Sequence, residues 1–168
     1  MGKVLVLMRH AKAESSAPSD LERRLTDRGH SDAADAGTWL AKQEIVPDYV
    51  LVSSAARTQQ TWEDVALAAG WDLELAEASE QLYRAGTEEA LEMLRATDDG
   101  VTTLLVIGHN PTIGQLAAFL DDGSSDDNEL DLADGYPTAT VTVFDYDGDW
   151  AELDEAEGTL RASHVGRG

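Results

Sequence analysis

Short apolar runs, separated by segments with helical periodicity, dominate the pattern of hydrophobic and polar positions along the chain. Runs at residues 4–8, 49–52 and 103–107 each have the length of a strand that is covered on both faces. An alternating segment at residues 138–144, followed by the turn signal Asp147-Gly148, predicts a hairpin whose return strand begins at Trp150. The segment 73–75 predicts one more short strand.

Between these strands, apolar residues recur at i, i+3 and i+4, which is the spacing of a helix with one buried face. The pattern predicts four helices. The first begins after an N-cap at Thr26, and the second passes through Trp62 and ends at Gly70. The third is capped by Thr87, and the fourth begins at Pro111 after an N-cap at Asn110. Strands that alternate with helices imply an α/β fold, a three-layer α/β/α sandwich with a mostly parallel central sheet.

The length and apolar content are those of one compact domain, because the chain has 168 residues, of which 42% are hydrophobic. We expect this domain to cover residues 1–162 and residues 163–168 to form a flexible tail that contains a solvated His164. His30 lies on the apolar stripe of the first helix, where we expect it to pack or to cap.

The charge balance is strongly acidic, with 33 acidic and 12 basic residues and a formal net charge of −21. This balance argues against nucleic acid or a membrane surface as partner, because both require a basic surface. The apolar periodicity argues against a disordered acidic chain. Self-repulsion of this size is easiest to tolerate in concentrated salt, where the Debye length is about 3 Å at 1 M. The composition therefore favours a halophilic source with an acidic proteome.

The chain contains no cysteine, which excludes disulfides and thiolate ligands or nucleophiles. No apolar stretch approaches the roughly 20 residues of a membrane span, and the N-terminus shows no basic leader, so we expect a cytoplasmic protein. The acidic stretch 121–134 lacks the ligand spacing of a calcium loop, so we interpret it as solvated surface. We predict neither a metal nor a cofactor.

Polar side chains follow each of the three apolar strands. Arg9 and His10 end the first strand, Ser53 and Arg57 follow the second, and His109 follows the third. In an open α/β sheet, ligands bind beyond the carboxyl ends of the strands, so we expect these side chains to converge. Arginine binds two phosphate oxygens at once, a neutral imidazole can attack phosphorus, and a second histidine can stabilise the charge in transit. The pattern predicts a phosphoryl-transfer site.

These residues also match a known family. The segment Met8-Arg9-His10-Ala11 resembles the Arg-His-Gly signature of the histidine phosphatase superfamily, with alanine in place of glycine. The order and spacing over roughly the first 120 residues resemble the SixA-type phosphohistidine phosphatases of that superfamily. The further segments that carry this resemblance are residues 20–29 (DLERRLTDRG), the Ser-x-x-x-Arg-x-x-x-Thr pattern from Ser53 to Thr61, and residues 108–111 (GHNP).

The resemblance implies a phosphoglycerate mutase-like fold and a phosphatase that forms a phosphohistidine intermediate. It implies that His10 is the nucleophile, that Arg9 and Arg57 hold the phosphoryl oxygens, and that His109 completes the pocket. The further substrate-binding candidates are Arg23, Arg24 and Ser53. Arg24 stands where the family usually has proline, so the sequence leaves open whether Arg23 or Arg24 enters the site. Lys12 either flanks the site or is simply solvated.

The general acid is the least defined part of this site. Glu80 is the first candidate and Asp20 the second. A phosphomonoester needs an acid to protonate its leaving alkoxide, whereas a departing imidazole, with a pKa of roughly 6.5, needs it far less. We therefore expect the substrate to be phosphohistidine on a protein. The alternatives are a small phosphorylated substrate, acted on by a phosphomonoesterase or mutase of the same superfamily, and a non-catalytic module that binds phosphate or a phosphoprotein.

Overall fold

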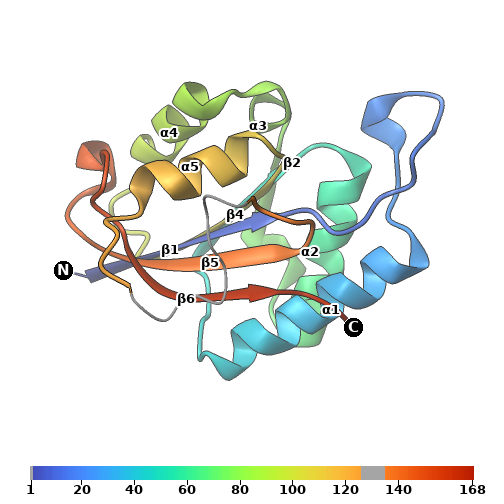
Figure 1. Ribbon diagram of the computed structural model, residues 1–168, viewed down its shortest axis with the longest axis horizontal. Coiled ribbons are helices and arrows are strands. Elements are labelled where there is room, and N and C mark those ends of the chain that lie inside the picture. The colour runs from blue at the N-terminus through green and yellow to red at the C-terminus, as the bar shows by residue number, and fades with distance from the viewer. Residues whose placement is uncertain (1, 126–134) are drawn as a thin grey trace.

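The computed structural model describes residues 2–125 and 135–168, in which one six-stranded sheet lies between two layers of helices (Figure 1). The strand order is β3-β2-β4-β1-β5-β6. The first four strands of this order run parallel, and β5 and β6 are antiparallel to their neighbours, so the predicted α/β sandwich with a mostly parallel sheet is confirmed. The strands are β1 (Gly2–Arg9), β2 (Tyr49–Ser53), β3 (Ala76–Ser79), β4 (Thr103–Gly108), β5 (Thr140–Asp147) and β6 (Thr159–Val165).

Helices cover both faces of the sheet. The helices are α1 (Asp27–Lys42), α2 (Ala56–Ala69), α3 (Glu80–Arg84), α4 (Thr87–Arg95) and α5 (Thr112–Leu120), and the 3-10 helices are η1 (Asp20–Glu22), η2 (Leu73–Leu75) and η3 (Trp150–Glu152). Along β1, Leu5 and Leu7 pack against α3, α4 and α5, whereas Val6 and Met8 pack against α1 and α2. Both faces of the strand are therefore buried, which is why its sequence is continuously apolar.

Two of the expected helix starts lie elsewhere. Gly86 is the N-cap of α4, because the Thr87 hydroxyl instead donates to the Gln115 side chain at 2.6 Å. Pro111 is the N-cap of α5, and the Asn110 side chain spans a wider turn. Its Nδ2 donates to the Tyr136 carbonyl at 2.7 Å, and its Oδ1 accepts from the Gly114 amide at 3.1 Å. The caps at Thr26 and Gly70 are as predicted.

Two predicted strand positions are wrong. Residues 73–75 form η2, because the Asp72 side chain accepts from the Glu74 amide and tightens the turn; the strand that pairs with β2 begins at Ala76. The chain after the Asp147-Gly148 turn forms η3 and not the return strand, because Trp150 is fully buried and its indole donates to the Val101 carbonyl at 2.8 Å. The return strand is β6, which begins at Thr159.

The expected flexible tail is ordered structure. Residues 163–165 belong to β6, the Gly166 amide donates to the Ala139 carbonyl, and the Gly168 amide donates to the Asp32 carboxylate on α1. His164 is not simply solvated, because its ring stacks on Trp39 with centroids 5.0 Å apart and its Nε2 lies 2.8 Å from Asp35. The carboxyl-terminal residues are therefore fixed to the beginning of α1.

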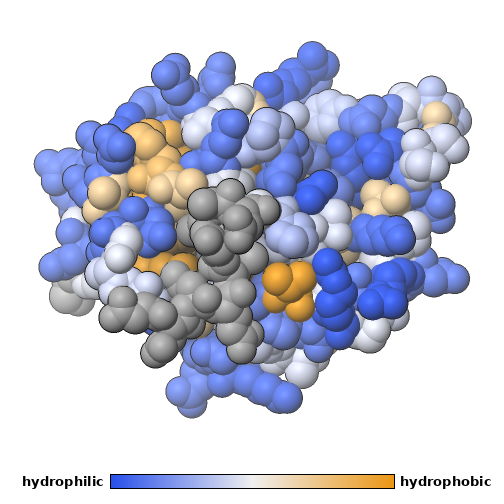
Figure 2. Space-filling view, viewed as in Figure 1, coloured by the Kyte–Doolittle hydropathy of each residue, from blue (hydrophilic) through white to orange (hydrophobic). Residues whose placement is uncertain are grey.

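The face shown in Figure 2 is mostly hydrophilic, with apolar residues exposed in a few places. Residues 126–134 of the acidic stretch lie outside the described part of the chain, and Asp121, at its start, forms a β-bridge with Gly158. None of the helices in the described ranges is long and apolar enough to cross a membrane.

Candidate active site

The ends of β1 and β4 bring two histidines together at one edge of the sheet. Arg9 pairs with Gly108 in the parallel register, so the residues that follow, His10 and His109, leave the sheet side by side. Their ring centroids lie 5.4 Å apart. β2 is the next strand along, and it places Ser53 against His109.

The ring of His10 is held in one tautomer. Its Nδ1 lies 2.7 Å from the Ala11 carbonyl, which only accepts hydrogen bonds, so in the neutral ring Nδ1 carries the proton and Nε2 carries the lone pair. The residue is 7% exposed. Burial, aided by the charges of Arg57 and Arg9, lowers the pKa of His10 to about 4, although the bond to Ala11 opposes this shift. His10 is therefore a neutral imidazole with a free Nε2 at neutral pH.

The backbone around His10 is fixed from three sides. Its amide donates to the Gly108 carbonyl and its carbonyl accepts from the Ala139 amide, each at 3.0 Å. The Ala11 amide donates to the Thr61 hydroxyl at 3.0 Å, and this hydroxyl donates in turn to the Arg57 carbonyl. The last threonine of the Ser-x-x-x-Arg-x-x-x-Thr pattern thus links the histidine loop to the helix that carries the arginine.

His109 is oriented through its Nε2 atom, which contacts Ser53. Its Nε2 lies 2.6 Å from the Ser53 hydroxyl, which also receives a long hydrogen bond from the Ala55 amide at 3.4 Å. In the tautomer in which this hydroxyl donates to Nε2, Nδ1 carries the ring proton; Nδ1 is buried and has no hydrogen-bond partner in the described part of the chain. Burial, with the charges of Arg57 and His10, lowers the pKa of His109 to about 3.

Arg57 is buried and donates through both terminal nitrogens to Asp20, at 2.8 Å to the carbonyl oxygen and 3.0 Å to the carboxylate. The other oxygen of the same carboxylate lies 2.9 Å from Arg23. Tyr83, which lies edge-on to His109, donates to the Asp20 carboxylate at 2.6 Å. The structure thus places Arg23 beside Arg57, whereas Arg24 is exposed in a separate hollow beside Glu14 and Glu22.

Neither candidate acid is placed to donate a proton. The hydrogen bonds from Tyr83, Arg23 and Arg57 hold the pKa of Asp20 far below its usual range, so this carboxylate is ionised at neutral pH. Glu80 points elsewhere: it pairs with Arg84 at 3.1 Å and lines a groove of about 700 Å³ between β3 and α4. The polar contacts of Glu80 in the described part of the chain are with Arg84, and none is with His10, Arg57 or His109, so its role as general acid stays a prediction.

Arg9 is the second arginine of the site, and a segment distant in sequence holds it. Its Nη1 donates to the Tyr136 carbonyl at 3.1 Å, and the Tyr136 hydroxyl donates to the Leu7 carbonyl at 2.8 Å. The Nε atoms of Arg9 and Arg57 are buried and, like Nδ1 of His109, have no partner among the described residues. Buried polar groups are normally satisfied, so these unpartnered atoms, on three residues predicted from the sequence to belong to the site, mark a candidate site for the oxygens of an anion.

Ser53 is fully buried and its hydroxyl contacts His109, so the structure places it against the histidine ring, and its role in substrate binding stays a prediction. Sequence reasoning missed Tyr83 and Tyr136, which no motif marks. No group of three or more histidine, aspartate or glutamate side chains in the described ranges could hold a metal ion.

The chain is similar to known proteins in both sequence and structure. The family model of the histidine phosphatase superfamily (branch 1) matches residues 5–83. Uncharacterized protein Rv1276c of Mycobacterium tuberculosis is 35% identical over 163 residues, which cover 95% of this chain and 100% of that protein. Phosphohistidine phosphatase SixA of Escherichia coli is 34% identical over 124 residues, which cover 71% of this chain and 74% of SixA. The chain belongs to the histidine phosphatase superfamily.

A solved structure shows the same relationship for nearly the whole histidine phosphatase chain. The putative SixA of Nakamurella multipartitia superposes with a TM-score of 0.82 at 32% identity and covers 99% of this chain and 97% of its own. The resemblance inferred from the motifs at Arg9-His10, Ser53–Thr61 and Gly108-His109 is thereby confirmed at the level of the family.

Proposed function

We propose that this histidine phosphatase removes the phosphoryl group from phosphohistidine on a protein, with His10 as nucleophile. The observation that carries the proposal is the free Nε2 of a buried neutral His10 beside unsatisfied donors of Arg9, Arg57 and His109. A neutral imidazole attacks phosphorus, and fixed donors stabilise the charge on the equatorial oxygens as it develops. The relatives named SixA support the same reaction.

The reaction has two balanced steps. Nε2 of His10 bonds to phosphorus while the phosphorus–nitrogen bond of the substrate breaks, and the leaving imidazole takes up a proton from solvent. Water then attacks phospho-His10, which releases inorganic phosphate and restores the imidazole. The arginines hold the phosphoryl oxygens in both steps, and Nδ1 of His109 donates to one of them.

The placement of the carboxylates supports a phosphorus–nitrogen bond over a phosphate ester. An alkoxide leaving group requires a positioned acid, but Asp20 is ionised and Glu80 lies in the groove beside β3. An imidazole with a pKa of roughly 6.5 leaves without one. The free phosphorylated substrate of a phosphomonoesterase or mutase is thus the less favoured alternative.

The test is phosphate release from a histidine-phosphorylated carrier protein and from an aryl phosphate. The assay is run in molar KCl, because a net charge of −21 favours a protein that works in salt. We expect faster release from the phosphoprotein and a loss of at least about 10³-fold in His10→Ala. His30→Ala is the matched control, since His30 pairs with Asp64 between α1 and α2.

Faster release from the aryl phosphate would overturn the choice of substrate. Full turnover in His10→Ala would overturn the mechanism. Retained binding of the phosphoprotein without any turnover in the native protein would favour the non-catalytic binding module.

A further inference from the structure

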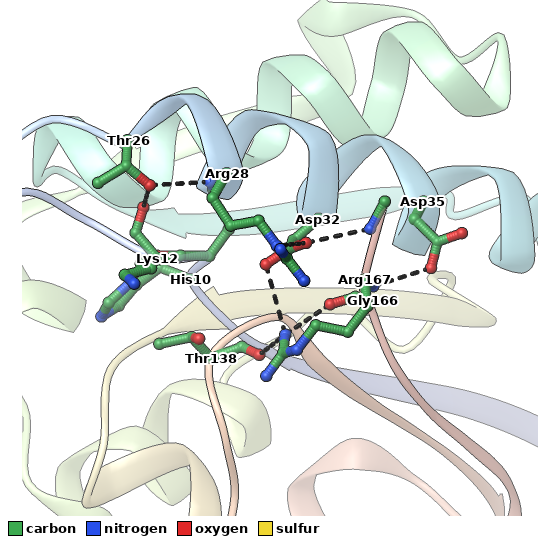
Figure 3. Close-up of polar contacts among 12 residues, drawn as sticks. His10, Lys12, Thr26, Arg28, Asp32, Asp35, Thr138, Gly166 and Arg167 are labelled. Atoms are coloured by element: carbon green, nitrogen blue, oxygen red, sulfur yellow. Dashed lines mark hydrogen bonds and ion pairs between the residues drawn. The ribbon is translucent and has the colours of Figure 1, made fainter.

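A second group of cations lies beside the pocket, at the beginning of α1. Arg28 and Arg167 share the buried carboxylate of Asp32, with Arg28 Nε 3.2 Å from one oxygen and Arg167 Nη1 3.5 Å from the other (Figure 3). Their side chains are 60% and 43% exposed. Lys12, two residues after His10, is exposed on the same side of α1 (Figure 3). We call Lys12, Arg28 and Arg167 the cationic ledge.

The ledge is fixed by the carboxyl-terminal segment. Arg167 Nη1 donates to the Thr138 carbonyl at 3.0 Å, and the amide of Gly168 donates to Asp32 at 3.0 Å. The three cations of the ledge face two carboxylates, Asp32 and Asp35, the second of which accepts from the Arg167 amide at 3.0 Å, so the ledge keeps an excess of positive charge. In the described part of the chain, neither the Nη groups of Arg28 nor the ammonium of Lys12 has a hydrogen bond or ion pair. These donors are free to meet an external anion.

The ledge stands out against the charge of the whole molecule. The net charge is −21, and the chain has 12 lysines and arginines in total. Of these, Arg9, Arg23 and Arg57 lie at the His10 site, and Lys12, Arg28 and Arg167 form the ledge. An anionic partner therefore meets its most favourable surface at this edge of the sheet.

Backbone connections show how far the ledge lies from the nucleophile. The Ala139 amide donates to the His10 carbonyl, and the Gly166 amide donates to the Ala139 carbonyl. Neighbouring strands lie about 4.8 Å apart, so the backbone that carries Arg167 is roughly 10 Å from that of His10. At this separation, a protein that carries its phosphoryl group on a histidine can contact the ledge while the phosphoryl group is at His10.

We propose that the cationic ledge binds an acidic surface patch next to the phosphohistidine of a protein substrate. The proposal rests on the proposed function and adds the chemistry of the partner. The forked donors of arginine match carboxylates geometrically. In molar salt, long-range attraction is screened within about 3 Å, so recognition there depends on direct pairs of the kind that Arg28 and Lys12 can form.

The test uses two histidine-phosphorylated peptides with the same central sequence, one with flanking aspartate and glutamate and one with asparagine and glutamine instead. Phosphoramidate serves as the small substrate. In the double variant Arg28→Gln/Arg167→Gln we expect kcat/KM for the acidic peptide to fall about tenfold, through KM. Release from the neutral peptide and from phosphoramidate should change less than about twofold.

The matched control is Arg84→Gln/Arg161→Gln, which removes the same charge from side chains that are 74% and 42% exposed and that pair with Glu80 and Asp145. We expect it to leave all three substrates unaffected. The variant Arg28→Lys/Arg167→Lys keeps the charge and a donor for Asp32, and it should retain most of the preference for the acidic peptide. It also keeps the test valid if the glutamine variant folds poorly.

An equal loss for both peptides, or an equal loss in the control, would show a general charge effect and overturn the proposal. A loss with phosphoramidate would mean that the ledge supports the pocket and does not dock substrate. If the native protein hydrolysed none of the three, the proposed function would fail, and anisotropy with the unphosphorylated acidic peptide would test the ledge separately. Binding that the double variant loses would support it, and equal binding would overturn it.

Discussion

The pocket at His10 and the groove between β3 and α4 differ in a way that is informative about the whole molecule. The groove is spacious, at about 700 Å³, and its acids, such as Glu77 and Glu80, are solvated or paired with nearby side chains. The pocket is marked instead by buried donors on Arg9, Arg57 and His109 that have no partner in the described ranges. Ser54 and Thr140 also have unpartnered buried hydroxyls, so it is the clustering of such atoms on two arginines and a histidine, and not free volume, that favours the His10 site for the proposed chemistry.

The largest predicted loss of activity in this comparison is at Arg57. Arg57→Ala removes a buried guanidinium from the pocket, and we expect phosphate release to fall about 10²- to 10³-fold, because fixed charge at the phosphoryl oxygens is lost. Arg57→Lys should recover part of the rate. Arg84→Ala, on the groove side, is the control and should match the native rate. A loss below threefold in Arg57→Ala would place the phosphoryl group elsewhere.

A substitution at Gly29, outside both the His10 site and the groove, tests how closely α1 packs against the backbone that follows His10. Gly29 lies where α1 touches the backbone that follows His10, and a Cβ at this position would overlap the Lys12 carbonyl oxygen. We expect Gly29→Ala to lower the free energy of unfolding by about 1–3 kcal/mol and to slow turnover. Gly2→Ala, where a Cβ meets nothing within 4 Å, is the control. Urea unfolding measures both, and equal stability of the two variants would contradict the close contact.

Burial of His10 predicts a dependence on pH. Its folded pKa of about 4 lies below the unfolded value of about 6.5, so between these values the unfolded chain binds more protons. The stability from the neutral ring is complete above pH 6.5 and is lost as the pH falls toward 4. His109, with a pKa of about 3, acts in the same direction.

A carbon-13 NMR titration of the His10 ring measures this directly, with the urea-unfolded chain as reference. A midpoint near 6.5 in the folded protein would contradict the burial of the ring.

The smallest predicted change in activity is for a substitution in the groove. Glu80→Gln removes the carboxylate that pairs with Arg84 at the surface, and we expect phosphate release to stay within about twofold of the native rate, since surface pairs contribute little. The assay used for Arg57 measures this variant as well. A tenfold loss would mean that the groove takes part in the reaction and would break the comparison between the two hollows.

The sequence was sufficient for those parts of the molecule that have a local pattern. The continuous apolar run before Arg9 predicts a strand buried on both faces, and its position fixes where His10 must leave the sheet. The caps at Thr26 and Gly70 could also be predicted from the sequence, because each depends on residues within one helical turn. The family motifs located the two histidines that the structure brings together.

The parts that the sequence did not reveal depend on contacts between distant segments. Tyr136 meets Arg9 across 127 positions, and Gly168 meets Asp32 across 136, so neither contact leaves a local signal. Residues 163–168 look like a polar tail only until Asp32 and Asp35 supply partners for their amides. The direction of the Glu80 side chain could not be predicted either, because it depends on the turn from β3 into α3, which its neighbours in sequence do not specify.

Asp20 gives the resting pocket an internal counter-ion. Its carboxylate pairs with terminal nitrogens of Arg57 and Arg23, whereas Nε of Arg57 has no partner in the described ranges. Under the proposed mechanism a phosphoryl oxygen binds at this Nε, so one guanidinium is shared between an internal and an external anion. The internal carboxylate then lowers the affinity of Arg57 for any anion, for released phosphate as much as for substrate.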